Sequence, residues 1–218
     1  MNTHSKTAMG WMIVTAVTAW FALALQLYIL IDNTPGNGMT PLGAVDRFLI
    51  FFTIWTNILV AVCVTLALLF PATRPGKFFS RPCTQTAIAL YILVVGIVYN
   101  VLLRGLVHLA GRGRLADELL HVVVPLLFVV YWIFFVPKGT LKWRNLLPWM
   151  IYPAFYLTYA LLRGSFSGFY PYPFLNVVEY GYQRVAVNSV GIMLVFVVLG
   201  LLLMALDKSL GRRRNGEE

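Results

Sequence analysis

The sequence predicts an all-α, polytopic membrane protein with six transmembrane helices. Of its 218 residues, 60% are hydrophobic and only 11% are charged, whereas a soluble domain carries about 25% charged residues. The hydrophobic residues gather in six runs, and a run of about 20 apolar residues is long enough to cross a bilayer as a helix. Proline, glycine and asparagine mark turns between these runs.

The runs place the six spans at about 9–31, 48–70, 86–110, 117–136, 147–162 and 185–206. The first run is too long for the core of a signal peptide and lacks a small-x-small cleavage site, so we expect it to remain as the first helix. The run 147–162 is the shortest of the set. No internal repeat or low-complexity linker divides the chain, which favours a single domain over residues 1–218.

The basic residues indicate how the chain is oriented. Six spans place the N-terminus, the second and fourth loops and the C-terminal tail on one side, and these segments carry 11 lysines and arginines against 5 in the other loops. The positive-inside rule puts that side in the cytoplasm. We therefore expect both termini on the cytoplasmic face of the plasma (cell inner) membrane. The net charge of +9 fits this topology and anionic membrane lipids, and we expect no nucleic-acid partner.

Polar side chains within the runs fall mostly toward the ends that this topology places outside. Isolated polar groups in a membrane face the protein interior and pair with one another, so we expect a polar cavity open to the outer leaflet above an apolar floor. A channel needs a polar lining through the full depth, and a transporter opens to both sides. The outer set comprises Thr53, Asn57, Asn100, Arg104, His108, Glu118, His121, Tyr159, Arg163, Arg184 and Asn188.

Charged residues at the start of the fourth run are candidates for function. Asp117, Glu118 and His121 lie within about one helical turn, and charges at membrane depth are costly. The alternative is a helix cap with an interfacial histidine. Arg104 needs an anionic partner, which is Glu118, Asp117 or the carboxylate or phosphate of a ligand. A structural ion pair between the third and fourth runs would also satisfy it.

The same set contains the elements of nucleophilic catalysis. His121 can act as a base near neutral pH, and a threonine hydroxyl such as that of Thr53 becomes a nucleophile when a base takes its proton. Thr53 could equally bond a backbone carbonyl, and Thr56 competes as the nucleophile. Asn57 and Asn100 either stabilise an oxyanion or join helices. A metal site needs several clustered ligands, and we expect neither metal nor cofactor.

Three motifs together resemble the androgen-induced protein family and its prokaryotic six-helix relatives. They are Phe52-Thr53-Ile54, the stretch from His121 through Pro125 to Phe128, and Tyr172-Pro173-Phe174-Leu175 in an aromatic loop before the last run. The resemblance covers most of the chain and implies six helices. It also implies a hydrolase of fatty acid esters of hydroxy fatty acids, with Thr53 as nucleophile and His121 as base. Trp55-Thr56-Asn57, Tyr99-Asn100 and Arg104 depart from the animal pattern.

Two main hypotheses follow from these observations. The first is a lipid esterase acting on a long-chain ester, and the second is a non-catalytic protein that binds anionic lipids or amphiphiles in the same cavity. The geometry of Thr53 and His121 separates them, and a transporter ranks last. Beyond this pair, the residues expected to bind substrate or an oxyanion are Asn57, Asn100, Arg104, Glu118, Tyr159, Arg163, Tyr172 and Asn188. Membrane lipids are the other expected partners, and the sequence does not indicate an oligomeric state.

Overall fold

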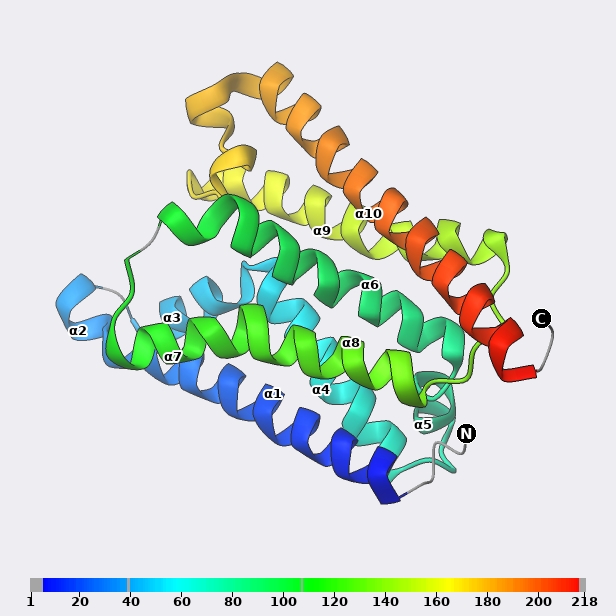
Figure 1. The fold of residues 1–218 in the computed structure, drawn as a ribbon. Helices are drawn as coiled ribbons and strands as arrows, with labels where there is room; N and C mark the ends of the chain where they lie inside the picture. Colours follow the sequence, from blue (N-terminus) through cyan, green and yellow to red (C-terminus); the bar gives the residue numbers. More distant parts are fainter. Residues whose placement is uncertain (1–5, 39, 107, 216–218) are drawn as a thin grey trace. The chain divides into compact units, whose positions relative to one another are not determined.

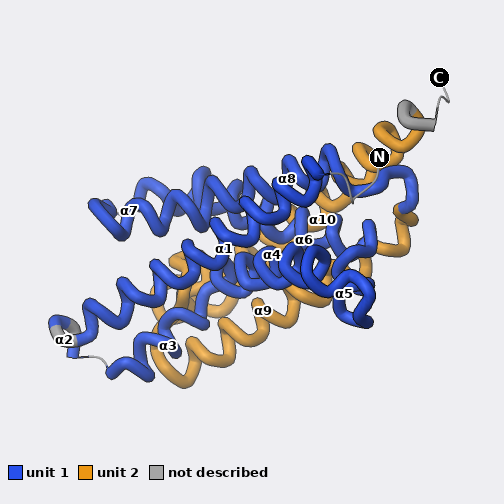
Figure 2. The backbone as a smooth tube through the Cα atoms, turned by 90° about the horizontal axis from the view of Figure 1, so that it is seen from below, with its two compact units in different colours: residues 1–140 blue, residues 141–218 orange. Residues whose placement is uncertain are grey.

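The computed structural model describes residues 6–38, 40–106 and 108–215. All regular secondary structure in these ranges is helical (Figure 1), which confirms the all-α class. The chain divides into two compact units, residues 1–140 and 141–218 (Figure 2). The single domain expected over the whole chain stays a prediction, and each unit is described by itself.

Unit 1 is a helical bundle built mainly from four long helices. These are α1 (Lys6–Asp32), α4 (Phe52–Leu69), α6 (Pro82–Val98) and α8 (Val124–Phe135). α1 packs against α4 and α8, while α6 also packs against both α4 and α8. Small residues on α1 such as Ala19 and Ala22 are fully buried, which lets neighbouring helices approach closely. Large side chains including Phe128, Tyr131 and Trp132 fill the core.

Shorter helices connect the long ones within unit 1. They are α2 (Thr34–Asn37), α3 (Pro41–Leu49), α5 (Arg74–Phe79) and α7 (Gly111–Glu118). A threonine begins both α3 and α5, because the Thr40 and Thr73 side chains each accept a hydrogen bond from a first-turn amide, with proline in the first turn. These are ordinary helix-start signals.

The second expected span begins later than the sequence suggested. The hydrophobic run starts at about residue 48, but α3 ends at Leu49 and α4 begins at Phe52. Phe51 between them is extended, with φ −89° and ψ 133°. The break places Thr53 in the first turn of α4 and not inside a continuous helix.

The third and fourth expected spans contain irregular turns. α6 runs on through the π-helical turn η1 (Tyr99–Leu103) and the 3₁₀ turn η2 (Arg104–Leu106). α7 joins α8 through a second π-helical turn, η3 (Leu119–Val123). The sequence predicts helices here but not the change of hydrogen-bond register.

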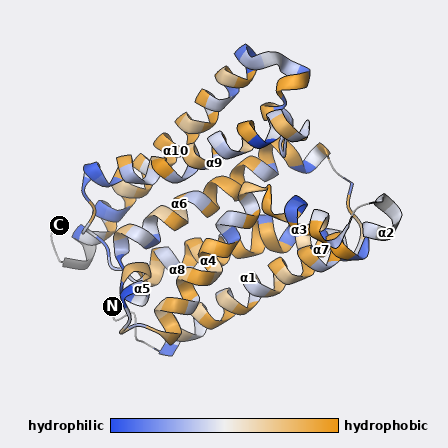
Figure 3. Cartoon of the chain, turned by 180° about the vertical axis from the view of Figure 1, so that it is seen from behind, coloured by the Kyte–Doolittle hydropathy of each residue, from blue (hydrophilic) through white to orange (hydrophobic). Residues whose placement is uncertain are grey.

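Five helices in the described ranges are long and apolar enough to cross a membrane. They are Lys6–Asp32, Phe52–Leu69, Pro82–Leu106, Gly111–Phe135 and Val177–Arg212. These coincide with the first four expected spans and the sixth, and hydrophobic residues cover most of α1, α4 and α8 (Figure 3). The fifth expected span lies in α9, which two prolines, three tyrosines and Arg163 make less apolar. That the chain has six spans, and that both termini lie on the cytoplasmic side of the membrane, stay predictions.

Unit 2 contains two long helices and the aromatic loop between them. α9 (Leu146–Ser167) follows the 3₁₀ turn η4 (Trp143–Asn145) and packs against α10 (Val177–Asn215). α10 is kinked at Gly181, whose φ of 71° is left-handed. Before it, the 3₁₀ turn η5 (Pro173–Leu175) belongs to the loop.

The aromatic loop is folded against the helices of unit 2. Tyr170 lies so close to Gly164 that a Cβ there would be 2.2 Å from the tyrosine ring. The Tyr172 ring stacks on Phe174 at 5.3 Å, and Asn188 Nδ2 donates to the Phe174 carbonyl at 2.9 Å. The predicted site residues Tyr172 and Asn188 therefore hold this loop in place.

Candidate functional site

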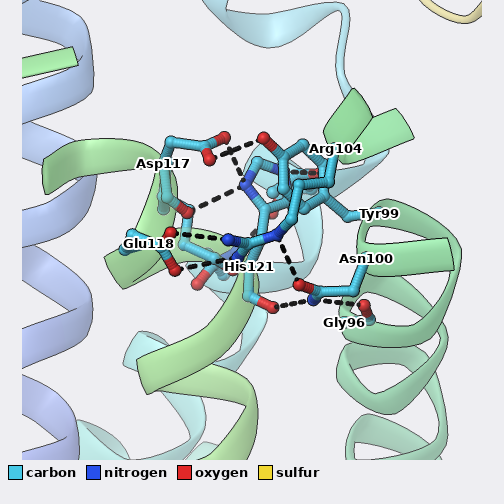
Figure 4. A network of polar contacts seen from close by, with 10 residues as sticks. Gly96, Tyr99, Asn100, Arg104, Asp117, Glu118 and His121 are labelled. Atoms are coloured by element: carbon cyan, nitrogen blue, oxygen red, sulfur yellow. Dashed lines mark hydrogen bonds and ion pairs between the residues drawn. The ribbon is translucent and has the colours of Figure 1, made fainter. Parts of the chain in front are cut away.

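A cluster of polar side chains lies in unit 1 where the first turn of α4 meets the two π turns (Figure 4). α4 supplies Thr53, η1 and the residue after it supply Tyr99, Asn100 and Arg104, and the end of α7 with η3 supplies Asp117, Glu118 and His121. The sequence places these residues in three separate runs. The fold brings them to one end of the bundle.

The centre of the cluster is a chain of three side chains. Thr53 Oγ1 lies 3.3 Å from His121 Nε2. On the other side of the ring, His121 Nδ1 lies 3.0 Å from Asp117 Oδ1 and 3.0 Å from the Asp117 carbonyl oxygen. Both partners of Nδ1 are acceptors, so a neutral imidazole carries its proton on Nδ1. Nε2 then presents its lone pair to the hydroxyl of Thr53, as a general base must.

The three side chains are largely removed from water. The side chains of His121 and Asp117 are 14% and 13% exposed, and Thr53 is 8% exposed as a residue. A small exposed fraction leaves access for a substrate while strengthening electrostatic contacts within the cluster. Thr56, the competing threonine, is completely buried, so the structure favours Thr53 over Thr56 as a group that a substrate could reach.

Tyr99 contacts two members of this chain. Its ring stacks on the His121 imidazole with centroids 3.7 Å apart and planes 16° apart. Its hydroxyl donates to Asp117 Oδ2 at 2.5 Å. The Asp117 carboxylate therefore uses one oxygen for His121 and the other for Tyr99.

Arg104 and Glu118 form an ion pair beside the chain. Arg104 Nη1 and Nη2 donate to the two carboxylate oxygens of Glu118 at 2.7 and 2.8 Å, and Nε donates to Asn100 Oδ1 at 2.7 Å. The two charged side chains are 40% and 33% exposed, so the pair lies at the rim. Of the partners that the sequence left open for Arg104, the structure selects Glu118. The acid in contact with His121 is Asp117.

Pro125 explains why two asparagines lie beside the π turns. Val124 N–H donates to the Leu119 carbonyl, five residues back, and Pro125 has no N–H. The carbonyls of Leu120 and His121 therefore lack their usual main-chain donors. A membrane helix tolerates such a proline only when neighbouring groups satisfy the freed carbonyls.

The asparagine amides satisfy those carbonyls. Asn57 Nδ2 donates to the Leu120 carbonyl at 3.2 Å and to the Thr53 carbonyl at 2.8 Å. Asn100 Nδ2 donates to the His121 carbonyl at 3.3 Å and to the Gly96 carbonyl at 2.7 Å. Each amide nitrogen has two N–H groups, and both are used. The oxyanion role expected of Asn57 and Asn100 is therefore not supported, and of the two roles that the sequence allowed, joining helices fits.

Gly96 lies where α6 faces η3. A Cβ at this position would lie 3.4 Å from both the His121 carbonyl oxygen and Pro125 Cβ, which is about van der Waals contact. The side-chain oxygen Oδ1 of Asn57, by contrast, is buried and has no hydrogen-bond partner. The two N–H groups of the Asn57 amide are used as donors, while its oxygen is a buried acceptor without a partner, which costs free energy.

The expected apolar floor of unit 1 contains polar pairs. Gln85 Nε2 donates to Tyr131 Oη at 3.3 Å, and Trp132 Nε1 donates to Thr86 Oγ1 at 2.8 Å, all within the buried core. Gln85 lies just before the start of the expected span at residue 86, so the prediction from sequence did not include it. These two hydrogen bonds join α6 to α8, although the buried Gln85 Oε1 has no hydrogen-bond partner. The outward cavity itself stays a prediction.

The remaining predicted site residues belong to unit 2. Tyr159 packs against Tyr156 with ring centroids 6.2 Å apart, and the Arg163 carbonyl accepts a hydrogen bond from Ser167. Together with Tyr172 and Asn188 they are described only within that unit, so their substrate-binding roles stay predictions. Among the described residues, no group of three or more His, Cys, Asp or Glu side chains is placed to hold a metal ion.

Two contributors to the cluster were missed by reasoning from sequence. Asp117 was expected as one of the charged candidates at the start of the fourth run and as a possible partner of Arg104, but not as the partner of His121. Its spacing of four residues from His121 puts both on one face of a helix. Tyr99 is brought to the cluster by a π turn, for which the sequence carries no clear signal.

Comparison with known proteins adds no relative. No protein-family model, curated protein or solved structure matches this chain. The resemblance to the androgen-induced protein family therefore stays a prediction based on its three motifs.

Proposed function

We propose that this protein is a membrane-embedded hydrolase of lipid esters, with Thr53 as nucleophile, His121 as general base and Asp117 as the group that orients His121. The observation that carries the proposal is the chain from Thr53 Oγ1 through the two imidazole nitrogens to the Asp117 carboxylate, with contacts of 3.3 and 3.0 Å. A nucleophile, a base and an orienting acid in this order are the minimal machinery of acyl transfer.

The reaction proceeds in two steps. His121 Nε2 takes the hydroxyl proton as Thr53 Oγ1 attacks the ester carbonyl, and the imidazolium then gives that proton to the departing alkoxide oxygen. This leaves an acyl-threonine and a free alcohol. Water then attacks the acyl group with His121 again as base, which releases the carboxylic acid and restores Thr53. Asp117 stabilises the imidazolium in both steps.

The oxyanion donor proposed in place of the asparagines is the main-chain N–H of Thr53. The first N–H groups of a helix lack an intrahelical acceptor, and the Leu49 carbonyl four residues back accepts instead from Trp55 Nε1 at 2.6 Å. An N–H on the nucleophile itself serves the same purpose in serine hydrolases. The break before α4 is what places Thr53 at such a position.

The proposed substrate is a long-chain ester drawn from the membrane. Five apolar helices support a location in the bilayer, and the resemblance in the sequence supports fatty acid esters of hydroxy fatty acids. The proposal includes six spans with both termini in the cytoplasm and the cluster toward the outer leaflet of the plasma membrane. The basic loops support this orientation.

A second candidate is a non-catalytic protein that binds anionic amphiphiles. It is favoured by the rim position of Arg104, whose guanidinium uses only three of its five N–H groups on Glu118 and Asn100. A carboxylate or phosphate headgroup could take the other two. No observation in the described residues favours a transporter.

A fluorophosphonate activity probe on the purified, detergent-solubilised protein tests the proposal. Labelling is expected in the wild type and in Thr56→Ala, and is expected to disappear in Thr53→Ala and His121→Ala. Size-exclusion profiles and circular dichroism establish that each variant is folded. A folded wild type that is not labelled, or a Thr53→Ala variant labelled like the wild type, contradicts the threonine mechanism.

A further inference from the structure

We propose that Tyr99 is a positioning residue that holds the Asp117–His121 pair in its reactive geometry. This inference rests on the proposed function, and it assigns a role to a residue that neither the sequence motifs nor the proposed mechanism uses. Tyr99 touches both partners of the pair, the ring at 3.7 Å and the carboxylate at 2.5 Å.

The ring and the hydroxyl constrain different motions. Stacking with planes 16° apart restricts rotation of the imidazole about its Cβ–Cγ bond, so that Nε2 stays directed at Thr53. The hydroxyl holds Asp117 Oδ2 and thereby leaves Oδ1 directed at His121 Nδ1. Without the hydroxyl, the carboxylate is free to rotate, and its contact with Nδ1 is no longer fixed.

The position of Tyr99 depends on the π turn at the end of α6. Within η1, Arg104 N–H donates to the Tyr99 carbonyl, five residues back. The Arg104 guanidinium also lies over the Tyr99 ring at 5.7 Å from its centroid, and its carboxylate partner Glu118 neighbours Asp117 in the chain. Arg104, which is paired with Glu118, therefore packs on the Tyr99 ring, and Tyr99 in turn packs on His121.

Kinetics of Tyr99→Phe test the role of the hydroxyl. Hydrolysis of 4-methylumbelliferyl heptanoate in detergent micelles is the assay. Because a hydrogen bond to a charged group is lost while the stacked ring remains, kcat is expected to fall about 10-fold. KM is expected to stay unchanged, because the proposed role of Tyr99 is to position Asp117 and His121 and involves no contact with the substrate. Tyr91→Phe, a buried tyrosine earlier on the same helix, is the matched control and is expected to behave like the wild type.

A double-mutant cycle shows whether Tyr99 acts through Asp117. Tyr99→Phe is expected to have no further effect on kcat in an Asp117→Asn background, since the orienting group is already lost. The same loss in both backgrounds would show an independent structural effect and overturn the proposal. So would a Tyr99→Phe variant with the wild-type kcat.

Carbethoxylation of His121 by diethyl pyrocarbonate gives a readout that needs no turnover. In a His4→Gln, His108→Gln background, His121 is the sole histidine, and its modification is followed by mass spectrometry. Tyr99→Leu uncovers the stacked imidazole and is expected to raise the rate several-fold, whereas Tyr99→Phe keeps the wild-type rate. Equal rates in folded Tyr99→Leu and wild type contradict the positioning role. If the wild type hydrolyses no ester, the hydrolase proposal fails and this measurement alone decides the role of Tyr99.

Discussion

At the scale of single residues, two adjacent acids have separate tasks. The Asp117 carboxylate contacts His121 and Tyr99, whereas the Glu118 carboxylate pairs with Arg104. Both acids lie within about one helical turn of His121, so nearness in the sequence does not separate them. The spacing of four residues favours Asp117 as the partner of His121, and the partner of Glu118 depends on where the turns after α6 place Arg104.

Paired substitutions of the two acids test this assignment. Asp117→Asn is expected to lower kcat for ester hydrolysis by about 100-fold or more, since the amide neither stabilises the imidazolium nor fixes its tautomer. Glu118→Gln, the matched change one residue away, removes an ion pair at the exposed rim, where such pairs contribute little, and is expected to keep most activity. The assay is the same ester hydrolysis. Equal losses in the two variants would contradict distinct roles.

At the scale of elements, apolar run length predicted the helices of unit 1 but not the turns that build the site. Runs of hydrophobic residues are a strong signal, and four expected spans coincide with helices there. A π turn inserts one residue into the hydrogen-bond register without changing hydrophobicity, so it escapes that signal. Such turns occur often at functional sites. Pro125, read only as part of a motif, was the one residue that pointed to an irregular register.

Pro125→Ala tests whether the proline maintains the π turn. Alanine supplies an N–H that can donate to the His121 carbonyl, so regular α-helical register is favoured across η3. A change of one residue in register rotates a side chain by about 100° around the helix axis, which would take His121 away from Thr53. Activity-probe labelling is expected to be lost while helix content is retained. Pro153→Ala, a change at the proline inside α9, is the control and should label normally.

At the scale of the whole molecule, the membrane class follows from composition, and the orientation from a count of spans. Large apolar side chains such as Val17, Phe21 and Leu126 are more than half exposed within unit 1, as expected for surfaces that face lipid. The open question is α9. If it crosses the membrane, the spans are even in number and both termini share a side. If it does not, they lie on opposite sides.

Cysteine accessibility in intact cells tests the orientation and with it the side of the candidate site. In a Cys63→Ala, Cys83→Ser background, single cysteines are introduced as Thr3→Cys, Arg114→Cys and Asn215→Cys. With six spans and cytoplasmic termini, a membrane-impermeant maleimide labels only Arg114→Cys until the cells are permeabilised. Asn215→Cys labelled in intact cells, with Thr3→Cys protected, would mean that α9 does not cross. Arg114 lies three residues before Asp117, so a protected Arg114→Cys would put the Thr53–His121 cluster at the cytoplasmic end and overturn the proposed outer-leaflet site.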